Sequence, residues 1–326
     1  MQAAWYEQQG EAKDVLVVGD MEDPLPGPGE VRVRILASGI NPGDIKKRAN
    51  QFGVGLPYPR IIPHSDGAGI IDCVGTEISK EWLNRRVWCY GAQSYRPFGT
   101  AAEMTVLPLA NIVPLPNGVP FEVGACLGIP GITAFRAVDV RNSIHGKTVL
   151  VQGAAGSVGS WAVKLAHQAK ARVIGVVRSD RDVALASQAG AEKVVLAGEG
   201  LFERIQALAP QGIDHIIDVD FAANITIDSQ ILAQGGSIAA YATSVQEPTF
   251  PFWPLAFMNA QLYFLGSDDF PVEEKIKATQ AINQALESDW SGPPIAQRFS
   301  LEEIAKAHDA VANPSTRGRV VIVMER

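Results

Sequence analysis

The scarce features of this sequence exclude several classes of protein. Among its 326 residues there are three cysteines, no long uninterrupted apolar run and a net charge of −7. A membrane-spanning helix needs about 18 or more apolar residues in succession, so none is expected. The acidic balance argues against nucleic acid and anionic membranes as partners. Residues 1–8 lack a basic segment leading into an apolar core, so no secretory signal is expected either.

The three cysteines are Cys73, Cys89 and Cys126, and their spacing fits no zinc or redox motif. Isolated cysteines of this kind are typically reduced and buried. We therefore expect free thiols and a cytoplasmic location.

The beginning of the chain differs in pattern from the middle. Residues 1–120 are rich in proline and glycine, with short alternating strands predicted over 31–36 and 102–106. Turn sequences recur between such strands, as at 26–29 and 115–118. This pattern predicts an antiparallel, partly open β-barrel domain.

A glycine-rich turn lies in the middle of the chain, where residues 148–159 read TVLVQGAAGSVG. An apolar run predicts a strand over 148–152, and a helical pattern follows over 160–166. Glycines at such positions permit a tight turn, close approach of a pyrophosphate and close helix packing. The phosphates would lie at the helix N-terminus. The alternative is an ordinary small-residue turn before a buried helix. The residues predicted to bind a dinucleotide here are Gly153, Ala154, Gly156, Ser157, Val158 and Gly159.

Further strands and helices alternate after this turn. Strands are predicted over 169–177, 192–196, 212–219, 236–241 and 261–266, with helical patterns over 181–189 and 200–209. This alternation is typical of an α/β Rossmann domain with a doubly wound parallel sheet.

The end of the second strand indicates which dinucleotide is bound. An acidic residue there would take the ribose hydroxyl of NAD, but this strand is followed by Arg178, Ser179, Asp180 and Arg181. Guanidinium groups match the oxygens of a 2′-phosphate. We therefore predict that NADP(H) is bound through Arg178, Ser179 and Arg181. The alternative is a solvated loop in which Asp180 faces the ribose.

The pattern becomes helical near residue 121, and the nucleotide-binding domain is predicted over 123–289. After a helical pattern over 301–308, a final strand is predicted over 318–323. We expect 290–326 to return to the first domain, 1–122. An active site would then lie in the cleft between the domains.

These features together resemble the medium-chain dehydrogenase/reductase superfamily. Five stretches are similar to its zinc-independent quinone oxidoreductase branch, the zeta-crystallin-like proteins: residues 38–44, 62–69, 128–135, 152–159 and 317–322. The resemblance implies a GroES-like fold for the β-barrel domain, NADPH as cofactor and a site in the inter-domain cleft.

The resemblance also implies that no metal is bound. A catalytic zinc needs three protein ligands. Alcohol dehydrogenases of the superfamily have a cysteine within the segment here read as 38–44, which contains none. Their second ligand corresponds to His64 and their third to Ile129, which cannot coordinate a metal. Only Cys89 lies in the region of their structural zinc lobe. We expect His64 to be a hydrogen-bonding residue at the cleft wall.

Without zinc, the chemistry favours acceptors that take a hydride with little help. Quinones, and alkenes conjugated to a carbonyl, spread the incoming charge onto an oxygen that neutral donors stabilise. We therefore expect an NADPH:quinone or enone reductase, in which the protein mainly aligns cofactor and substrate. The alternatives are reduction of simple aldehydes or ketones, and a non-enzymatic NADPH-binding protein.

Three residues are candidates for the catalytic donors. The Asn41 amide would contact the substrate oxygen or the nicotinamide ribose, or merely cap a turn before Pro42. Lys46 stands where relatives often have tyrosine, and the alternative is a surface lysine. Tyr90 resembles a cleft tyrosine of the family, and the alternative is a core aromatic residue with a satisfied hydroxyl.

Further cofactor contacts are implied by the resemblance or by position at strand ends. Thr133 matches a threonine beside the nicotinamide, and Tyr241 follows a strand expected to face the adenosine. Phe264 and Gly266 end a strand near the expected nicotinamide pocket. Arg319 lies in the returning C-terminal segment. The resemblance also implies that the strand over 261–266 is the edge at which relatives pair two nucleotide domains. Since an unblocked apolar edge strand invites pairing, we expect a homodimer.

Overall fold

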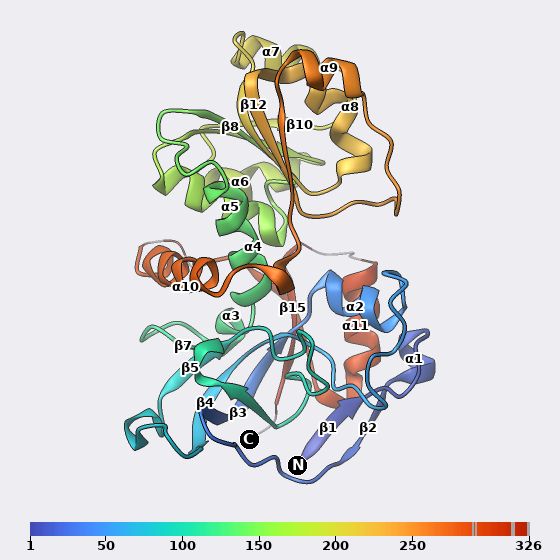
Figure 1. The fold of residues 1–326 in the computed structure, drawn as a ribbon, viewed down its shortest axis with the longest axis vertical. Coiled ribbons are helices and arrows are strands. Elements are labelled where there is room, and N and C mark those ends of the chain that lie inside the picture. The colour runs from blue at the N-terminus through green and yellow to red at the C-terminus, as the bar shows by residue number, and fades with distance from the viewer. Residues whose placement is uncertain (289, 291, 314–316, 325–326) are drawn as a thin grey trace. The chain divides into compact units, whose positions relative to one another are not determined.

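The computed structural model describes residues 1–288, 290, 292–313 and 317–324 (Figure 1). The chain forms two compact units, Met1–Pro130 with Pro293–Arg326, and Gly131–Gly292. The first unit thus extends to Pro130, past the boundary expected at residue 122, because α3 (Phe121–Gly124) packs on strands of the first unit. The boundary expected at residue 289 falls outside the described residues.

The first unit is built on a largely antiparallel sheet. Its strand order is β14-β15-β3-β4-β5-β7, with β6 also paired to β3, and only the β14–β15 pair is parallel. A separate antiparallel pair joins β1 and β2. The strands are β1 (Gln2–Trp5), β2 (Val17–Asp20), β3 (Glu30–Gly39), β4 (Asp66–Val74), β5 (Arg86–Cys89), β6 (Met104–Pro108), β7 (Ile112–Pro114), β14 (Ile295–Phe299) and β15 (Arg319–Val323).

Alternation along β3 places one of its faces in the core of this unit. Val31, Val33 and Ile35 are buried together with Ile322 of β15 and Ile304. The period of two that predicted this strand therefore also marks its buried face. The helical segments are α1 (Ala12–Val15), α2 (Pro42–Arg48), η1 (Lys80–Trp82), η2 (Leu109–Asn111), α3, η5 (Leu301–Glu303) and α11 (Ile304–Ala312).

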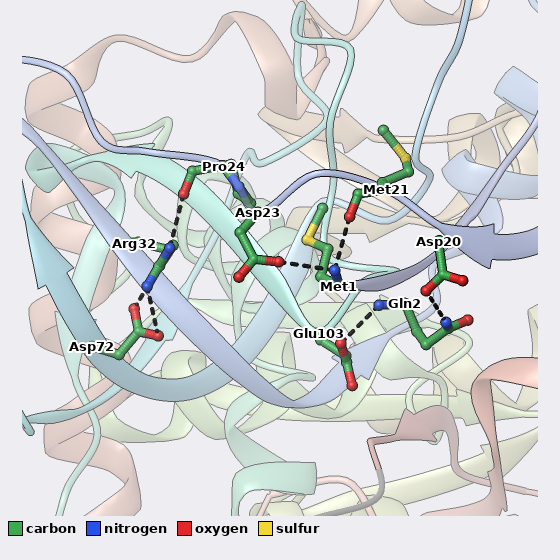
Figure 2. Close-up of polar contacts among 9 residues, drawn as sticks. All are labelled: Met1, Gln2, Asp20, Met21, Asp23, Pro24, Arg32, Asp72 and Glu103. Carbon is green, nitrogen blue, oxygen red and sulfur yellow. Dashed lines mark hydrogen bonds and ion pairs between the residues drawn. The ribbon is translucent and has the colours of Figure 1, made fainter.

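Polar contacts join the N-terminal segment and two neighbouring strands of this unit (Figure 2). The Met1 ammonium group donates to the Met21 carbonyl and to Asp23, each at 2.8 Å. The Arg32 guanidinium donates to Asp72 at 2.9 Å and to the Pro24 carbonyl at 3.1 Å, which ties β3, β4 and the segment after β2 together.

The second unit contains a fully parallel six-stranded sheet in the order β10-β9-β8-β11-β12-β13. Counted from β8, this is the order 3-2-1-4-5-6 of the Rossmann fold. The strands are β8 (Thr148–Gln152), β9 (Arg172–Val177), β10 (Lys193–Leu196), β11 (Ile213–Asp218), β12 (Leu232–Ala240) and β13 (Gln261–Phe264). The predicted doubly wound parallel sheet is confirmed.

Helices cover the sheet in two groups, as seen in Figure 1. Helix α5 packs beside α6 and α10, whereas α8 packs beside α7 and α9. No helix within the described part of the chain is long and apolar enough to cross a membrane. The helical segments are α4 (Gly128–Asp139), α5 (Ser157–Gln168), η3 (Asp180–Asp182), α6 (Val183–Ala189), α7 (Leu201–Leu208), α8 (Phe221–Ile231), α9 (Phe252–Phe257), η4 (Ser267–Asp269) and α10 (Val272–Leu286).

Candidate functional site

The glycine turn joins β8 to α5 as the sequence predicts. Gly153 has a φ of +66°, which favours glycine. A Cβ atom on Gly159 would lie 2.1 Å from the Gly153 carbonyl oxygen, and one on Gly156 would lie 3.1 Å from the same atom. The Ala154 amide donates to Val176 of β9 at 2.9 Å. The absence of side chains at 156 and 159 therefore lets α5 start directly against the turn.

This turn lies at the point where the strand order reverses. β8 has β9 on one side and β11 on the other. A Cβ on Gly153 would lie 3.0 Å from the side chain of Val219, which follows β11. Ligands of such sheets bind at this point, outside the carboxyl ends of the strands. The first turn of α5, which includes Ser157 and Val158, offers amide groups and a positive dipole end to an anion there.

Two exposed arginines follow β9. Arg178 and Arg181 form no hydrogen bond or ion pair with any residue that the structure describes. Between them, the Ser179 hydroxyl donates to the buried Asp182 at 3.1 Å, and Asp180 is exposed. Two guanidinium groups without a carboxylate partner can neutralise a phosphate dianion.

A buried acidic pair, which the sequence did not indicate, supports the ends of β8 and β11. Gln152 donates through Nε2 to Asp228 of α8 at 2.9 Å. Asp218 accepts from the Asp220 amide at 2.9 Å and from Asn224 at 2.6 Å. Burial raises the pKa of both aspartates, and the charge of Asp218 raises the pKa of Asp228 further. The hydrogen bonds that Asp218 accepts act in the opposite direction and favour its ionised form.

The other predicted cofactor residues of this unit lie outside the turn itself, and three of them lie at or after the carboxyl ends of β12 and β13. Tyr241 follows β12, and its amide donates to the Asp218 carbonyl at 3.1 Å. Phe264 ends β13 with 67% of its surface exposed, and a Cβ on Gly266 would meet no atom within 4 Å. Because the strands are parallel, these residues follow the same sheet edge as Gly153. Thr133 is buried within α4.

In the first unit, Asn41 is held by side chains from three segments. It precedes Pro42 at the start of α2, and its backbone amide donates to Asp44 at 2.7 Å. Its side-chain Nδ2 donates to Asp66 at 2.7 Å, and its Oδ1 accepts from Arg319 at 2.8 Å. Asn41 is therefore both a helix-capping residue and the centre of a buried polar cluster, formed by Asn41, Asp66 and Arg319.

Sequence analysis missed Asp66, the first residue of β4. It has no exposed surface, and both carboxylate oxygens accept from the Ile129 amide at 2.9 Å. Burial raises its pKa to about 7, whereas the bonds from Asn41 and Ile129 act in the opposite direction. A Cβ on Gly128 would lie 2.1 Å from the Asp66 carboxylate, so only glycine permits this approach. The one sequence indication was an acidic residue inside an apolar stretch.

The other two catalytic candidates have local partners. The Tyr90 hydroxyl donates to the Ala110 carbonyl at 2.9 Å, and burial raises its pKa. Its proton is thus already engaged, as in the alternative of a satisfied core aromatic. Lys46 is half-buried, with Nζ 5.9 Å from the centre of the Phe52 ring.

His64 is fully buried, and both of its ring nitrogens form hydrogen bonds. Nδ1 lies 2.8 Å from the Ser38 hydroxyl, and Nε2 lies 2.9 Å from Nε2 of His308. Among the described residues, no three His, Cys, Asp or Glu side chains are grouped to hold a metal ion.

Comparisons with known proteins agree with this architecture. Residues 27–117 match the family model described as alcohol dehydrogenase GroES-like domain, and residues 157–279 match the one described as zinc-binding dehydrogenase. A quinone oxidoreductase of Mus musculus is 30% identical over 317 residues, covering 94% of this chain and 92% of the relative. A Pseudomonas aeruginosa quinone oxidoreductase is 30% identical over 321 residues, covering 95% and 96%.

Solved structures share the whole fold. A mycobacterial protein complexed with NADPH has a TM-score of 0.87 and 25% identity, covering 99% of this chain and 100% of its own. An NAD-dependent alcohol dehydrogenase also has a TM-score of 0.87, with 26% identity and full coverage of both chains. As the resemblance of its motifs predicted, the chain belongs to the quinone oxidoreductase branch of the medium-chain dehydrogenase/reductase superfamily.

Proposed function

We propose that this oxidoreductase uses NADPH to reduce quinones, or alkenes conjugated to a carbonyl. The observation that carries the proposal is the pair Arg178 and Arg181 at the end of β9, exposed and without carboxylate partners in the described chain. An NAD-binding site would present a carboxylate directly after this strand, where this chain has Arg178, and the exposed Asp180 lies two residues further on. The NADPH complex of a structural neighbour supports the same cofactor.

The residues present fit this cofactor. A side chain at 159 would strike the Gly153 carbonyl, so glycine there keeps the start of α5 against the turn, where its amide groups would bind the pyrophosphate. Arg178, Ser179 and Arg181 would hold the 2′-phosphate. When bound, NADPH supplies a hydride to the acceptor. The protein itself binds the phosphates and orients the two reactants.

Asn41 is the group we propose for contact with the acceptor oxygen. One N–H of its amide is donated to Asp66, and its oxygen accepts from Arg319. The second N–H makes no hydrogen bond with the described residues. With two atoms of the amide fixed, this N–H has a defined direction, which is what stabilisation of a developing oxyanion requires.

Oxidation of NADPH in the presence of different acceptors tests the proposal. Benzoquinones, short enones and aliphatic aldehydes are compared at equal concentration by the loss of nicotinamide absorbance. We expect turnover with quinones or enones and little with aldehydes. Tight NADPH binding without turnover on any acceptor would refute a reductase function.

The Asn41→Ala variant tests the donor. We expect kcat/KM for the acceptor to fall more than about tenfold, and about 100-fold if Asn41 contributes the ~3 kcal/mol of a full oxyanion donor. The control is Asn117→Ala, which changes an exposed asparagine in a surface turn of the same unit. An unchanged kcat/KM in Asn41→Ala would remove this residue from the mechanism.

We also propose a homodimer through β13, which ends the sheet of the second unit. Its outer backbone groups can pair with the same strand of a second copy. Aromatic residues of α9 and β13 are exposed nearby in sequence: Phe252, Trp253, Phe257 and Phe264 are each at least 60% exposed. Light scattering of the purified protein checks this, and a monomer at micromolar concentration would contradict it.

The three cysteines support a cytoplasmic location. All are free thiols in the structure, and Cys89 and Cys126 are buried. A reducing compartment keeps such thiols unpaired. Fractionation of the native host with thiol labelling tests this placement.

A further inference from the structure

Two buried histidines meet in the first unit, and the proposed chemistry uses neither of them, although hydrogen bonding was expected of His64. His64 precedes β4, and His308 lies in α11. Neither has exposed surface, their Nε2 atoms are 2.9 Å apart, and their rings stack with centroids 5.1 Å apart. Two facing nitrogens form a hydrogen bond only if one of them, and not both, carries the proton.

Arg48 at the end of α2 determines which nitrogen carries it. Its Nε lies 3.3 Å from Nδ1 of His308, and a guanidinium can only donate. The His308 proton is therefore on Nε2, from which it is donated to Nε2 of His64. The His64 proton must then be on Nδ1, which donates to the Ser38 hydroxyl at 2.8 Å.

The other end of the chain of bonds imposes the same direction. The Thr100 hydroxyl donates to the Asp66 carbonyl oxygen at 2.7 Å, and that oxygen can only accept. Ser38 must therefore donate to Thr100, at 2.7 Å, and accept from His64. Both ends thus require a single arrangement of protons, with no conflict at any step.

Protonating either imidazole would break this arrangement. A second proton on His64 would point at the Nε2–H of His308, and a second proton on His308 would point at Arg48. Burial lowers the pKa of His64 to about 3, and burial with the charges of His64 and Arg48 places the pKa of His308 well below its ordinary value. The pair therefore stays neutral at physiological pH.

This series of hydrogen bonds ends at Asp66, which also accepts a hydrogen bond from Asn41. Asp66 accepts from Thr100 through its backbone and from Asn41 through its side chain. Arg48 and Asn41 belong to opposite ends of α2. The series Arg48, His308, His64, Ser38, Thr100 and Asp66, which we call the histidine relay, thus connects both ends of the helix that presents Asn41.

We propose that His64 and His308 are positioning residues, which act through Ser38, Thr100 and Asp66 to fix the direction of the Asn41 amide. This role rests on the proposed function of Asn41. The arrangement of protons within the relay is independent of that function, so the two are tested separately.

Nitrogen-15 NMR of histidine side chains tests the proton arrangement in the intact protein at pH 7. We expect the Nε2–H tautomer for His308 and the less common Nδ1–H tautomer for His64. His215 is an internal reference, because its Nε2 lies 2.7 Å from the Ala137 carbonyl and must carry the proton. A shared tautomer for His64 and His308, or a charged imidazole in either, would overturn the relay.

The Thr100→Val variant tests positioning, because valine keeps the shape and removes the hydroxyl. We expect kcat to fall about tenfold while the Kd for NADPH is unchanged, since misplaced reacting groups slow turnover. Thr100→Ser keeps the hydroxyl and should restore most of the activity. The control is Thr105→Val, since the buried hydroxyl of Thr105 has no partner in the described structure and its loss should leave kcat unaltered.

The outcomes separate the two proposals. If the tautomers are as expected but Thr100→Val lowers only the melting temperature, the relay is purely structural and the positioning role is refuted. If the wild-type protein reduces no quinone or enone, the proposed function fails, and the positioning role with it, whatever the tautomers.

Discussion

Substitution of Arg178 should change the KM for NADPH far more than the KM for NADH. NADPH and NADH differ only in the 2′-phosphate. In the ratio of their KM values, the contribution of every contact therefore cancels except that of the contact with this phosphate. Arg178 is exposed and has no other partner in the described chain, so its removal disturbs nothing else. A hydrogen bond to a charged group contributes ~1.5–3 kcal/mol. The exposed position favours the lower value, because solvent screens the interaction.

Arg178→Ala should therefore raise KM for NADPH about tenfold. Arg178→Glu adds repulsion, worth ~1–2 kcal/mol for a phosphate dianion at about 5 Å in water, and should raise it about 100-fold. KM for NADH should change less than about twofold in both variants. The assay is the initial rate with a benzoquinone at varied cofactor concentration, repeated at higher salt, where the NADPH effect should shrink.

Lys193→Glu is the matched control. Lys193 is an exposed cation of the same unit, but it begins β10 and so lies at the amino-terminal end of the parallel strands, whereas Arg178 follows the carboxyl end of β9. We expect no change for either cofactor. Equal losses for NADPH and NADH in Arg178→Glu would refute the assignment of the 2′-phosphate site.

Three further predictions concern other parts of the molecule. Gly159→Ala places a Cβ 2.1 Å from the Gly153 oxygen, so the turn must shift. The shift should lower the free energy of unfolding by ~1–3 kcal/mol, and calorimetry should show weaker binding of NADPH. Burial raises the pKa of Asp66 from 3.8 to about 7, so its contribution to stability is complete below pH 4 and is lost as the pH rises to 7. Compared with Asp66→Asn, the wild type should lose ~4 kcal/mol of unfolding free energy over that interval in urea titrations. Trp253→Ser should weaken the proposed dimer in light scattering, because it removes a large exposed ring.

Each of these has a control or a contradicting result. Gly27→Ala should bind NADPH normally, because its Cβ would meet only Glu30 at 3.4 Å. If wild type and Asp66→Asn show parallel stability curves from pH 4 to 8, the raised pKa is wrong. Leu25→Ser, the control for Trp253→Ser, also removes an exposed apolar side chain but lies in the first unit. It should leave the mass of the dimer in light scattering unaltered. If both variants lowered the mass of the dimer equally, Trp253 of α9 would have no specific part in the proposed interface.

Local patterns predicted the elements of the nucleotide unit well. The strand β8 lies where its apolar β-branched run placed it, and β9 ends at the predicted residue 177 but begins at 172 rather than 169. Gly153 has a positive φ, in keeping with the tight turn predicted there. Helix α8 was missed, because its sequence, FAANITIDSQI, has no distinct apolar face. It runs directly into β12, which begins at Leu232 rather than at the expected residue 236. The amphipathic α10 was missed as well.

The partners within the polar clusters of the first unit could largely not be predicted from the sequence. Asn41 was found from its segment, but its partners Asp66 and Arg319 are 25 and 278 positions away. No local pattern indicates which distant side chains share a buried site. Tyr90 shows the same limit, since its identity does not reveal that its hydroxyl faces Ala110.

The return of the C-terminal segment governs the order in which the protein folds during synthesis. The unit Gly131–Gly292 is complete before residues 293–326 leave the ribosome, and its sheet needs none of them. The first unit cannot be complete until β15 has been synthesised, because β15 pairs with β3 and carries Arg319. Domains generally fold as units as they emerge, so the nucleotide site should form first. A chain truncated before β15 would then bind its nucleotide while lacking the Arg319 contact to Asn41, so the pairing of β15 with β3 is what completes the polar cluster around Asn41.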